Sequence, residues 1–134
     1  MDPENTQVTQ AEATQEAFKA SVPVLLQGIP GAPTTEQIEQ WKAKFGDVYI
    51  SAFSETEIFI WRALTRPEYL QIQQSAQHQP MFEEMVCTAC TIYKSVPGDF
   101  ATGKAGTPST LHEQIMNNSN FLPPAAASVL VAKL

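Results

Sequence analysis

Residues 34–69 have the sequence TTEQIEQWKAKFGDVYISAFSETEIFIWRALTRPEY, and this stretch determines the expected fold. Thr34 and Gln37 have the spacing of a capping box, in which two side chains satisfy the free N–H groups at a helix start. Gly46 stands where a left-handed helix stop is needed. Between these signals a single helical face carries Ile38, Trp41 and Phe45. The pattern therefore predicts a helix from the capping box to the glycine.

Two runs of β-branched and aromatic residues follow, at 47–53 and 57–63, with a short polar turn between them. Such runs predict strands, and the short connection predicts an antiparallel hairpin. Successive side chains of a strand point to opposite faces, so the hairpin is apolar on both faces. In the second strand the large apolar residues are Ile58, Phe59, Ile60 and Trp61. Such a hairpin must be covered on both sides, by helices, by the rest of the chain or by a neighbouring subunit.

Further helices are expected after the hairpin. A second capping box with proline in the first turn, at 65–68, predicts a helix over 66–77. Pro80 predicts the start of a helix that runs to residue 94, and Pro108 the start of another. A short apolar helix is expected over 125–134. The result is an α+β fold, with a small antiparallel hairpin, four to five helices and an extended N-terminal arm.

The chain is expected to divide into an N-terminal arm (1–33), a core domain (34–122) and a C-terminal apolar helix or tail (123–134). The arm is polar at first and then contains three prolines and two glycines. Because proline interrupts helices, this pattern predicts an extended arm that packs on its own domain or on another chain. The apolar side chains of the arm that are expected to bind a partner are Val24, Leu25, Leu26 and Ile29.

Composition excludes several classes of function. The chain has 134 residues, enough for one domain that needs neither a metal nor a disulfide. Eight basic against fourteen acidic residues, without a cluster of Lys or Arg, argue against nucleic-acid binding. No segment approaches the roughly 18 apolar residues that span a bilayer. The acidic, polar N-terminus differs from a secretory signal, so we expect synthesis in a reducing cytoplasm and free thiols.

Two motifs suggest chemistry. Cys87 and Cys90 form a C-x-x-C pair, but the pair falls inside a predicted helix and a structural zinc site takes four ligands. Buried core thiols are therefore expected, with zinc binding as an alternative. The stretch 98–105 nearly matches a phosphate-binding loop, but Ala105 replaces the hydroxyl residue that ligates magnesium. We expect a connector there, and neither a cofactor nor a small-molecule substrate.

Two arginines are candidates for partner binding. Arg62 ends the second predicted strand, and Arg66 begins the helix that follows. A guanidinium at such a place can hold a partner's carboxylate or stack on an aromatic ring. The alternative is an internal salt bridge with Glu57 or Glu68. Neither histidine forms a catalytic constellation with a nucleophile, so the protein is expected not to be an enzyme.

A pattern of cap and core residues runs from about 35 to 121. It begins with a Trp-Lys helix that ends in a Phe-Gly-x-Val turn, followed by a hairpin that ends in Arg-x-Leu-Thr-Arg-x-Glu-Tyr. A helix with Glu-Glu-x-Val-x-x-x-Cys comes next, and a last helix precedes Ser-x-Phe. The positions are Trp41, Lys42, Phe45, Gly46, Val48, Arg62, Leu64, Thr65, Arg66, Glu68, Tyr69, Glu83, Glu84, Val86, Cys90, Ser119 and Phe121. Together they resemble small proteins of tailed bacteriophages.

This resemblance implies a role in the virion or in its assembly, without catalytic residues. We expect a structural component of the tail, baseplate or neck, made in the host cytoplasm and retained in the virion. The expected partners are other phage structural proteins and copies of the chain itself. The two ends of the chain depart from the pattern and suit a protein that ties neighbours together. An assembly chaperone absent from the mature particle is the first alternative, and a small zinc-binding protein is the second.

Overall fold

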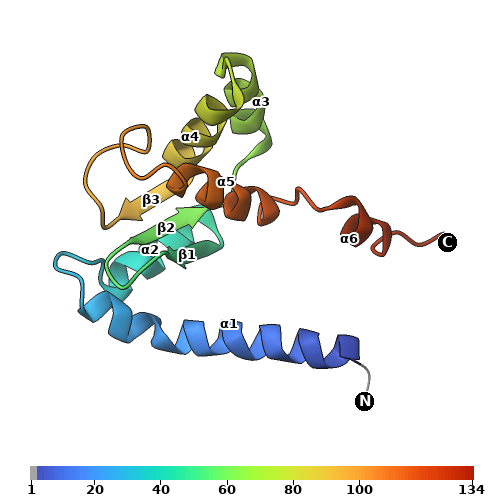
Figure 1. Ribbon diagram of the computed structural model, residues 1–134, viewed down its shortest axis with the longest axis horizontal. Coiled ribbons are helices and arrows are strands. Elements are labelled where there is room, and N and C mark those ends of the chain that lie inside the picture. Colours follow the sequence, from blue (N-terminus) through green and yellow to red (C-terminus); the bar gives the residue numbers. More distant parts are fainter. Residues whose placement is uncertain (1–2) are drawn as a thin grey trace. The chain divides into compact units, whose positions relative to one another are not determined.

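The computed structural model describes residues 3–134, with side chains from residue 13 onward; Met1 and Asp2 lie outside the described residues. The chain divides into two compact units (Figure 1). We call them the N-terminal unit (Met1–Thr34) and the core unit (Thr35–Leu134). Each is described by itself.

The N-terminal unit contains one long helix, α1 (Pro3–Gln27), so the prediction of an extended arm over 1–33 is wrong for most of its length. The prediction gave Pro23 too much weight. A proline inside a helix removes one backbone donor, but the Ala, Gln and Glu residues before it favour the helix strongly. Pro30 and Pro33 follow the end of the helix, where proline interrupts nothing.

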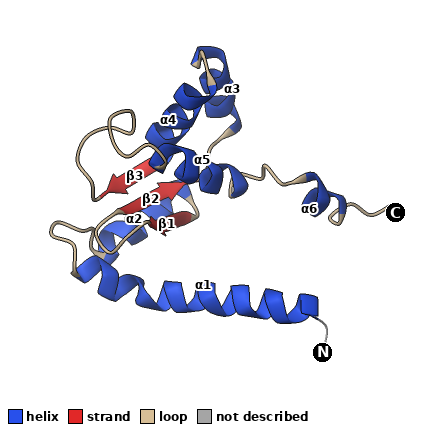
Figure 2. Cartoon of the chain, in the orientation of Figure 1, coloured by secondary structure: helices blue, strands red, loops and turns tan. Residues whose placement is uncertain are grey.

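The core unit is built on a three-stranded antiparallel sheet in the order β1 (Val48–Ala52), β2 (Ile58–Arg62), β3 (Thr91–Lys94). Figure 2 shows these strands among the helices of the unit. The predicted α+β class and the β1–β2 hairpin are confirmed, with Ile50 opposite Ile60. Both predicted strands are slightly shorter than expected, because their end residues belong to the turns.

The third strand is a correction to the prediction of one helix over 80–94. Helix α4 (Gln79–Cys90) ends at Cys90, and β3 pairs with the free edge of β2, with Tyr93 opposite Ile60. Two physical causes favour the strand. Residues 91–93 are β-branched or aromatic, and the edge of β2 offers unpaired N–H and C=O groups.

Signals at the helix ends agree with the structure. The other helices of the core unit are α2 (Thr35–Phe45), α3 (Arg66–Ser75), α5 (Thr107–Asn117) and α6 (Pro124–Ser128). Gly46 has a φ of 84° and its N–H donates to the Lys42 carbonyl, so the predicted glycine stop is confirmed. At the start of α3, the N–H and the hydroxyl of Thr65 both donate to the Glu68 carboxylate.

The strand β2 is buried on both faces, as the hairpin pattern requires. Phe59 and Trp61 are 0% and 3% exposed and belong to the main hydrophobic cluster with residues of α4 and α5. Ile58 and Ile60, on the opposite face, are 0% and 2% exposed. Helix α2 contacts β1, but none of its own side chains is fully buried. None of the described helices combines the length and apolar character needed to cross a membrane.

A buried chain of hydrogen bonds fastens the sheet to α5. The indole N–H of Trp61 donates to Ser51 Oγ at 2.8 Å, and that hydroxyl donates to Gln114 Oε1 at 2.5 Å. Ser51 is 7% exposed, so water cannot easily replace these bonds.

Replacing Ser51 by alanine should therefore destabilise the protein. The buried indole N–H of Trp61 would lose its acceptor, and the partly buried side-chain oxygen of Gln114 would lose its donor. An unsatisfied buried group of this kind costs about 1–3 kcal/mol in the free energy of unfolding. Urea denaturation followed by tryptophan fluorescence measures this change. Ser75→Ala, at the exposed end of α3, is the matched control and should change stability by less than about 0.5 kcal/mol. Equal stabilities of the two variants would contradict the role given to Ser51.

Candidate functional site

The apolar residues predicted to bind a partner differ widely in exposure. Val24, on α1, is 72% exposed, whereas Leu25 and Leu26 are half-buried. Ile29 follows the helix and is only 8% exposed. Val24 is therefore the member of this set whose side chain is most available to another molecule.

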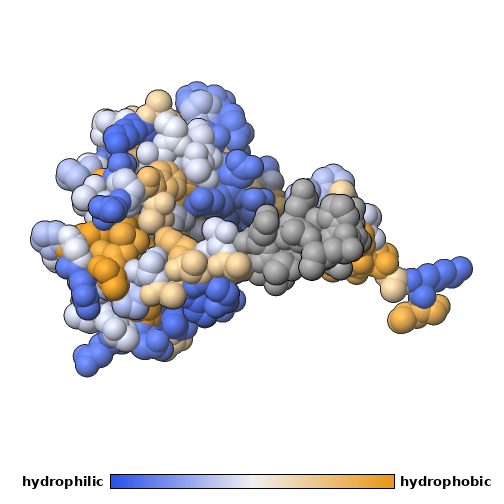
Figure 3. All heavy atoms as spheres, turned by 60° about the horizontal axis from the view of Figure 1, so that its bottom comes forward, coloured by the Kyte–Doolittle hydropathy of each residue, from blue (hydrophilic) through white to orange (hydrophobic). Residues whose placement is uncertain are grey.

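Among the described residues, most of the highly exposed Val and Leu side chains lie in the C-terminal segment (residues 122–134). Four of them are 71% exposed or more, namely Val129, Leu130, Val131 and Leu134. The predicted helix over 125–134 is present only as α6, and β-branched valines after Ser128 explain its early end. In Figure 3 the exposed atoms of this segment include hydrophobic ones. These residues were not among the predicted site residues, although the mostly apolar sequence AAASVLVAKL after two prolines was the available signal.

Arg62 is used inside the core unit. Its Nη1 and Nη2 donate to the two carboxylate oxygens of Glu68, each at 2.8 Å, and Nη2 also donates to the Ala89 carbonyl at 2.9 Å. The guanidinium lies 5.4 Å from the centre of the Phe45 ring. Hydrogen bonds from Arg62 lower the pKa of Glu68 to about 2. Arg62 thus connects β2 with α2, α3 and α4. Its partner is Glu68, so the alternative of an internal salt bridge is the one that the structure shows.

Arg66 is exposed, and its guanidinium lies 5.3 Å from the centre of the Tyr69 ring. Glu57 pairs with Lys104 at 2.8 Å rather than with either arginine. Arg66 is therefore available on the surface to a partner's carboxylate. The guanidinium of Arg62 is instead paired with Glu68 inside the core unit.

Cys87 and Cys90 are both buried free thiols. Burial raises the pKa of each thiol to about 12, and Cys87 Sγ donates to the Pro108 carbonyl at 3.4 Å. Zinc binding and nucleophilic attack both require the thiolate, which this environment disfavours. Among the side chains of residues 13–134, no group of three or more His, Cys, Asp or Glu residues is arranged to hold a metal ion.

A polar cluster between α4 and α5 was not foreseen. The Ser109 hydroxyl donates to Glu83 Oε1 at 2.8 Å, and His112 Nδ1 lies 4.0 Å from Glu83 Oε2. In a catalytic triad the imidazole stands between the hydroxyl and the carboxylate. Here the carboxylate stands between the other two groups, so the imidazole is not placed to take the hydroxyl proton. Burial also lowers the pKa of His112.

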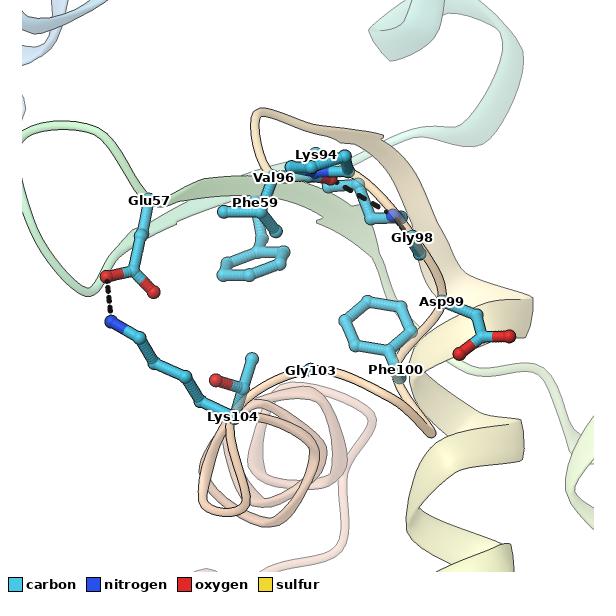
Figure 4. Close-up of a pocket in the computed structure, with 11 residues that line it drawn as sticks. Glu57, Phe59, Lys94, Val96, Gly98, Asp99, Phe100, Gly103 and Lys104 are labelled. Atoms are coloured by element: carbon cyan, nitrogen blue, oxygen red, sulfur yellow. Dashed lines mark hydrogen bonds and ion pairs between the residues drawn. The ribbon is translucent and has the colours of Figure 1, made fainter.

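The loop that contains residues 98–105, the stretch similar to a phosphate-binding loop, borders a pocket of about 350 Å3. The rings of Phe59 and Phe100 face its interior, and the Glu57–Lys104 ion pair stands at one side (Figure 4). The loop follows an antiparallel strand, and Lys104 is paired with a carboxylate. A phosphate-binding loop would instead follow a parallel strand and point its lysine at the phosphate. This pocket is therefore better suited to an apolar side chain than to a nucleotide.

Comparison with models of protein families, with curated proteins and with solved structures finds no match to this chain. The arrangement of its own residues therefore carries the functional argument. Their clearest feature is the set of exposed apolar side chains in the C-terminal segment, together with Val24 and Arg66.

The Arg62–Glu68 pair makes a prediction about pH. The folded pKa of Glu68, about 2, lies below its ordinary value of 4.5. The pair should therefore stabilise the fold fully above about pH 4.5, and less as the pH falls toward 2. Glu68→Gln should cost about 1–3 kcal/mol at pH 7, because the mostly buried guanidinium of Arg62 loses its charge-assisted hydrogen bonds.

Urea denaturation at several pH values tests this. The difference in the free energy of unfolding between wild type and Glu68→Gln should shrink as the pH falls from 4.5 to about 2. Glu55→Gln, in the exposed turn between β1 and β2, is the matched control and should differ little from wild type at any pH. A Glu68→Gln difference that does not change with pH would show that the ion pair is not its source.

Proposed function

We propose that the protein is a non-enzymatic structural component of a tailed-phage virion, in the tail, baseplate or neck, that binds neighbouring subunits. The observation that carries the proposal is the exposure of four large apolar side chains in the C-terminal segment. Single exposed apolar residues are normal on protein surfaces, but a run of them marks an interaction site. The resemblance of the central block to tailed-phage proteins supplies the biological setting.

The energy available from this segment is sufficient for docking. Burying one Val or Leu side chain contributes about 1.5–3 kcal/mol, so four contribute roughly 6–12 kcal/mol before the cost of ordering the segment. Ordering costs a substantial part of that gain. A contact of this kind is weak for one pair of molecules, and it becomes stable when many copies are held in one particle.

The polar groups of the core unit support a role without catalysis. Arg62, Glu68 and Ser51 hold the fold together, and the two cysteines are buried thiols. The unit therefore acts as a rigid block that presents apolar segments to its neighbours. Other structural proteins of the particle and copies of this chain are the proposed partners.

The assembly chaperone remains the competing proposal, because a chaperone would also present apolar surface to a tail component. The two proposals differ in whether the protein is present in the mature particle. A structural component stays in the mature virion, whereas a chaperone leaves before assembly is complete.

Quantitative mass spectrometry of purified phage particles separates the two. We expect the protein in mature particles at a fixed ratio to the major tail protein. Its absence from particles, together with its presence in infected cells, would contradict the structural role and favour the chaperone.

A matched pair of variants tests the proposed docking segment. Leu130→Asp should keep the stability of wild type, because Leu130 is 71% exposed, but should reduce incorporation into particles at least ten-fold. Ser128→Asp adds the same charge to the same segment without removing an apolar side chain, so it should be incorporated nearly normally. Incorporation is measured by complementing a phage that lacks the gene. Normal incorporation of Leu130→Asp would exclude this segment as the docking element.

A further inference from the structure

An apolar groove lies between α3 and α4 and is also lined by the loop that contains Phe100. We call it the α3–α4 groove. Its volume is about 460 Å3, within the range of roughly 300–1,000 Å3 that is usual for ligand sites. Apolar side chains from both helices and the loop line it, among them Ile72, Met81, Met85 and Phe100. Methionine side chains adapt easily to apolar partners, so such a surface suits a flexible apolar segment.

The charges that line the groove are acidic. Glu84 and Asp99 contribute to its lining, and none of the described Lys or Arg side chains does so. The Asp99 carboxylate accepts hydrogen bonds from Thr102, whereas Glu84 has no salt-bridge partner among the described side chains. The groove is thus apolar inside with an unpaired negative charge, and its occupant should be apolar with a positive charge.

The C-terminal segment has this chemistry. Its side chains are mostly apolar, and Lys133 is its only charged residue. Residues 129–131 are highly exposed, and no residue of the segment lines the groove of its own chain. The segment and the groove are therefore two exposed apolar surfaces of the same chain with complementary charge.

We infer that the C-terminal segment of one copy docks in the α3–α4 groove of a second copy. Leu130 and its valine neighbours would fill the methionine-lined groove, and Lys133 would pair with Glu84. Because groove and segment are different surfaces, copies can associate head to tail or by reciprocal exchange of segments. The inference deepens the proposed function, on which its biological meaning rests, by naming a second copy as one of the neighbours.

A charge exchange in the full chain tests the contact. Sedimentation velocity at increasing protein concentration, at a fixed salt concentration of about 150 mM, measures self-association. Glu84→Lys and Lys133→Glu should each weaken association about two- to five-fold, as expected for a partly exposed ion pair. The double variant restores the opposite charges and should regain most of the wild-type affinity. Leu130→Asp should weaken association at least ten-fold.

A matched control separates the local contact from net charge. Glu113→Lys changes the net charge by the same amount as Glu84→Lys, but Glu113 lies on the exposed surface of α5, outside the groove lining. It should not weaken association, since it only reduces the repulsion between acidic copies. Circular dichroism of each variant verifies that the fold is intact.

Three results would overturn the inference. They are a wild-type chain that stays monomeric at all concentrations, association that survives Leu130→Asp, and single charge variants that the double variant does not rescue. A monomeric protein that is still incorporated into particles would end this inference and leave the proposed function standing. A protein that associates as described but is absent from particles would contradict the proposed function and leave this inference standing.

Discussion

Burial of β2 on both faces is the constraint on which the core unit depends. Ile58 to Trp61 alternate between the two faces, and each of these four side chains is 3% exposed or less. A strand of this kind cannot stay in water on either side, so helices must pack against it. The side chains of Phe59 and Trp61 cluster with residues of α4 and α5, while α2 contacts the neighbouring strand. The β2 edge that faces away from β1 is closed by β3.

The charged and thiol side chains that could have carried chemistry instead stabilise the packing around β2. Arg62, at the end of β2, binds Glu68 at the start of α3 and the carbonyl of Ala89 near the end of α4. Cys87 and Cys90 pack in the hydrophobic cluster. The core is complete without the C-terminal segment, whose apolar side chains remain on the surface. This division between a finished core and an unburied segment is the physical basis for proposing a docking protein.

Local signals predicted much of the fold. The Thr65–Glu68 capping box, the Gly46 stop and the two-faced hairpin depend on neighbouring residues, and all three are present. Features decided by distant partners were not predictable. The strand β3 depends on the open edge of β2, and the α3–α4 groove depends on how two helices and a loop meet. The Arg62 choice between Glu57 and Glu68 was also open, because only the folded chain sets those distances. For α1, the error was to let Pro23 outweigh a long run of good helix formers.

The central claim is that the C-terminal segment is unburied in the free protein and becomes buried when the protein assembles. Hydrogen exchange measured by mass spectrometry tests this most directly, on the dilute protein and on purified particles. We expect residues 122–134 to exchange rapidly in the dilute protein and slowly in the particle, while β2 exchanges slowly in both. Slow exchange of the segment in the dilute protein, or rapid exchange in the particle, would contradict this claim.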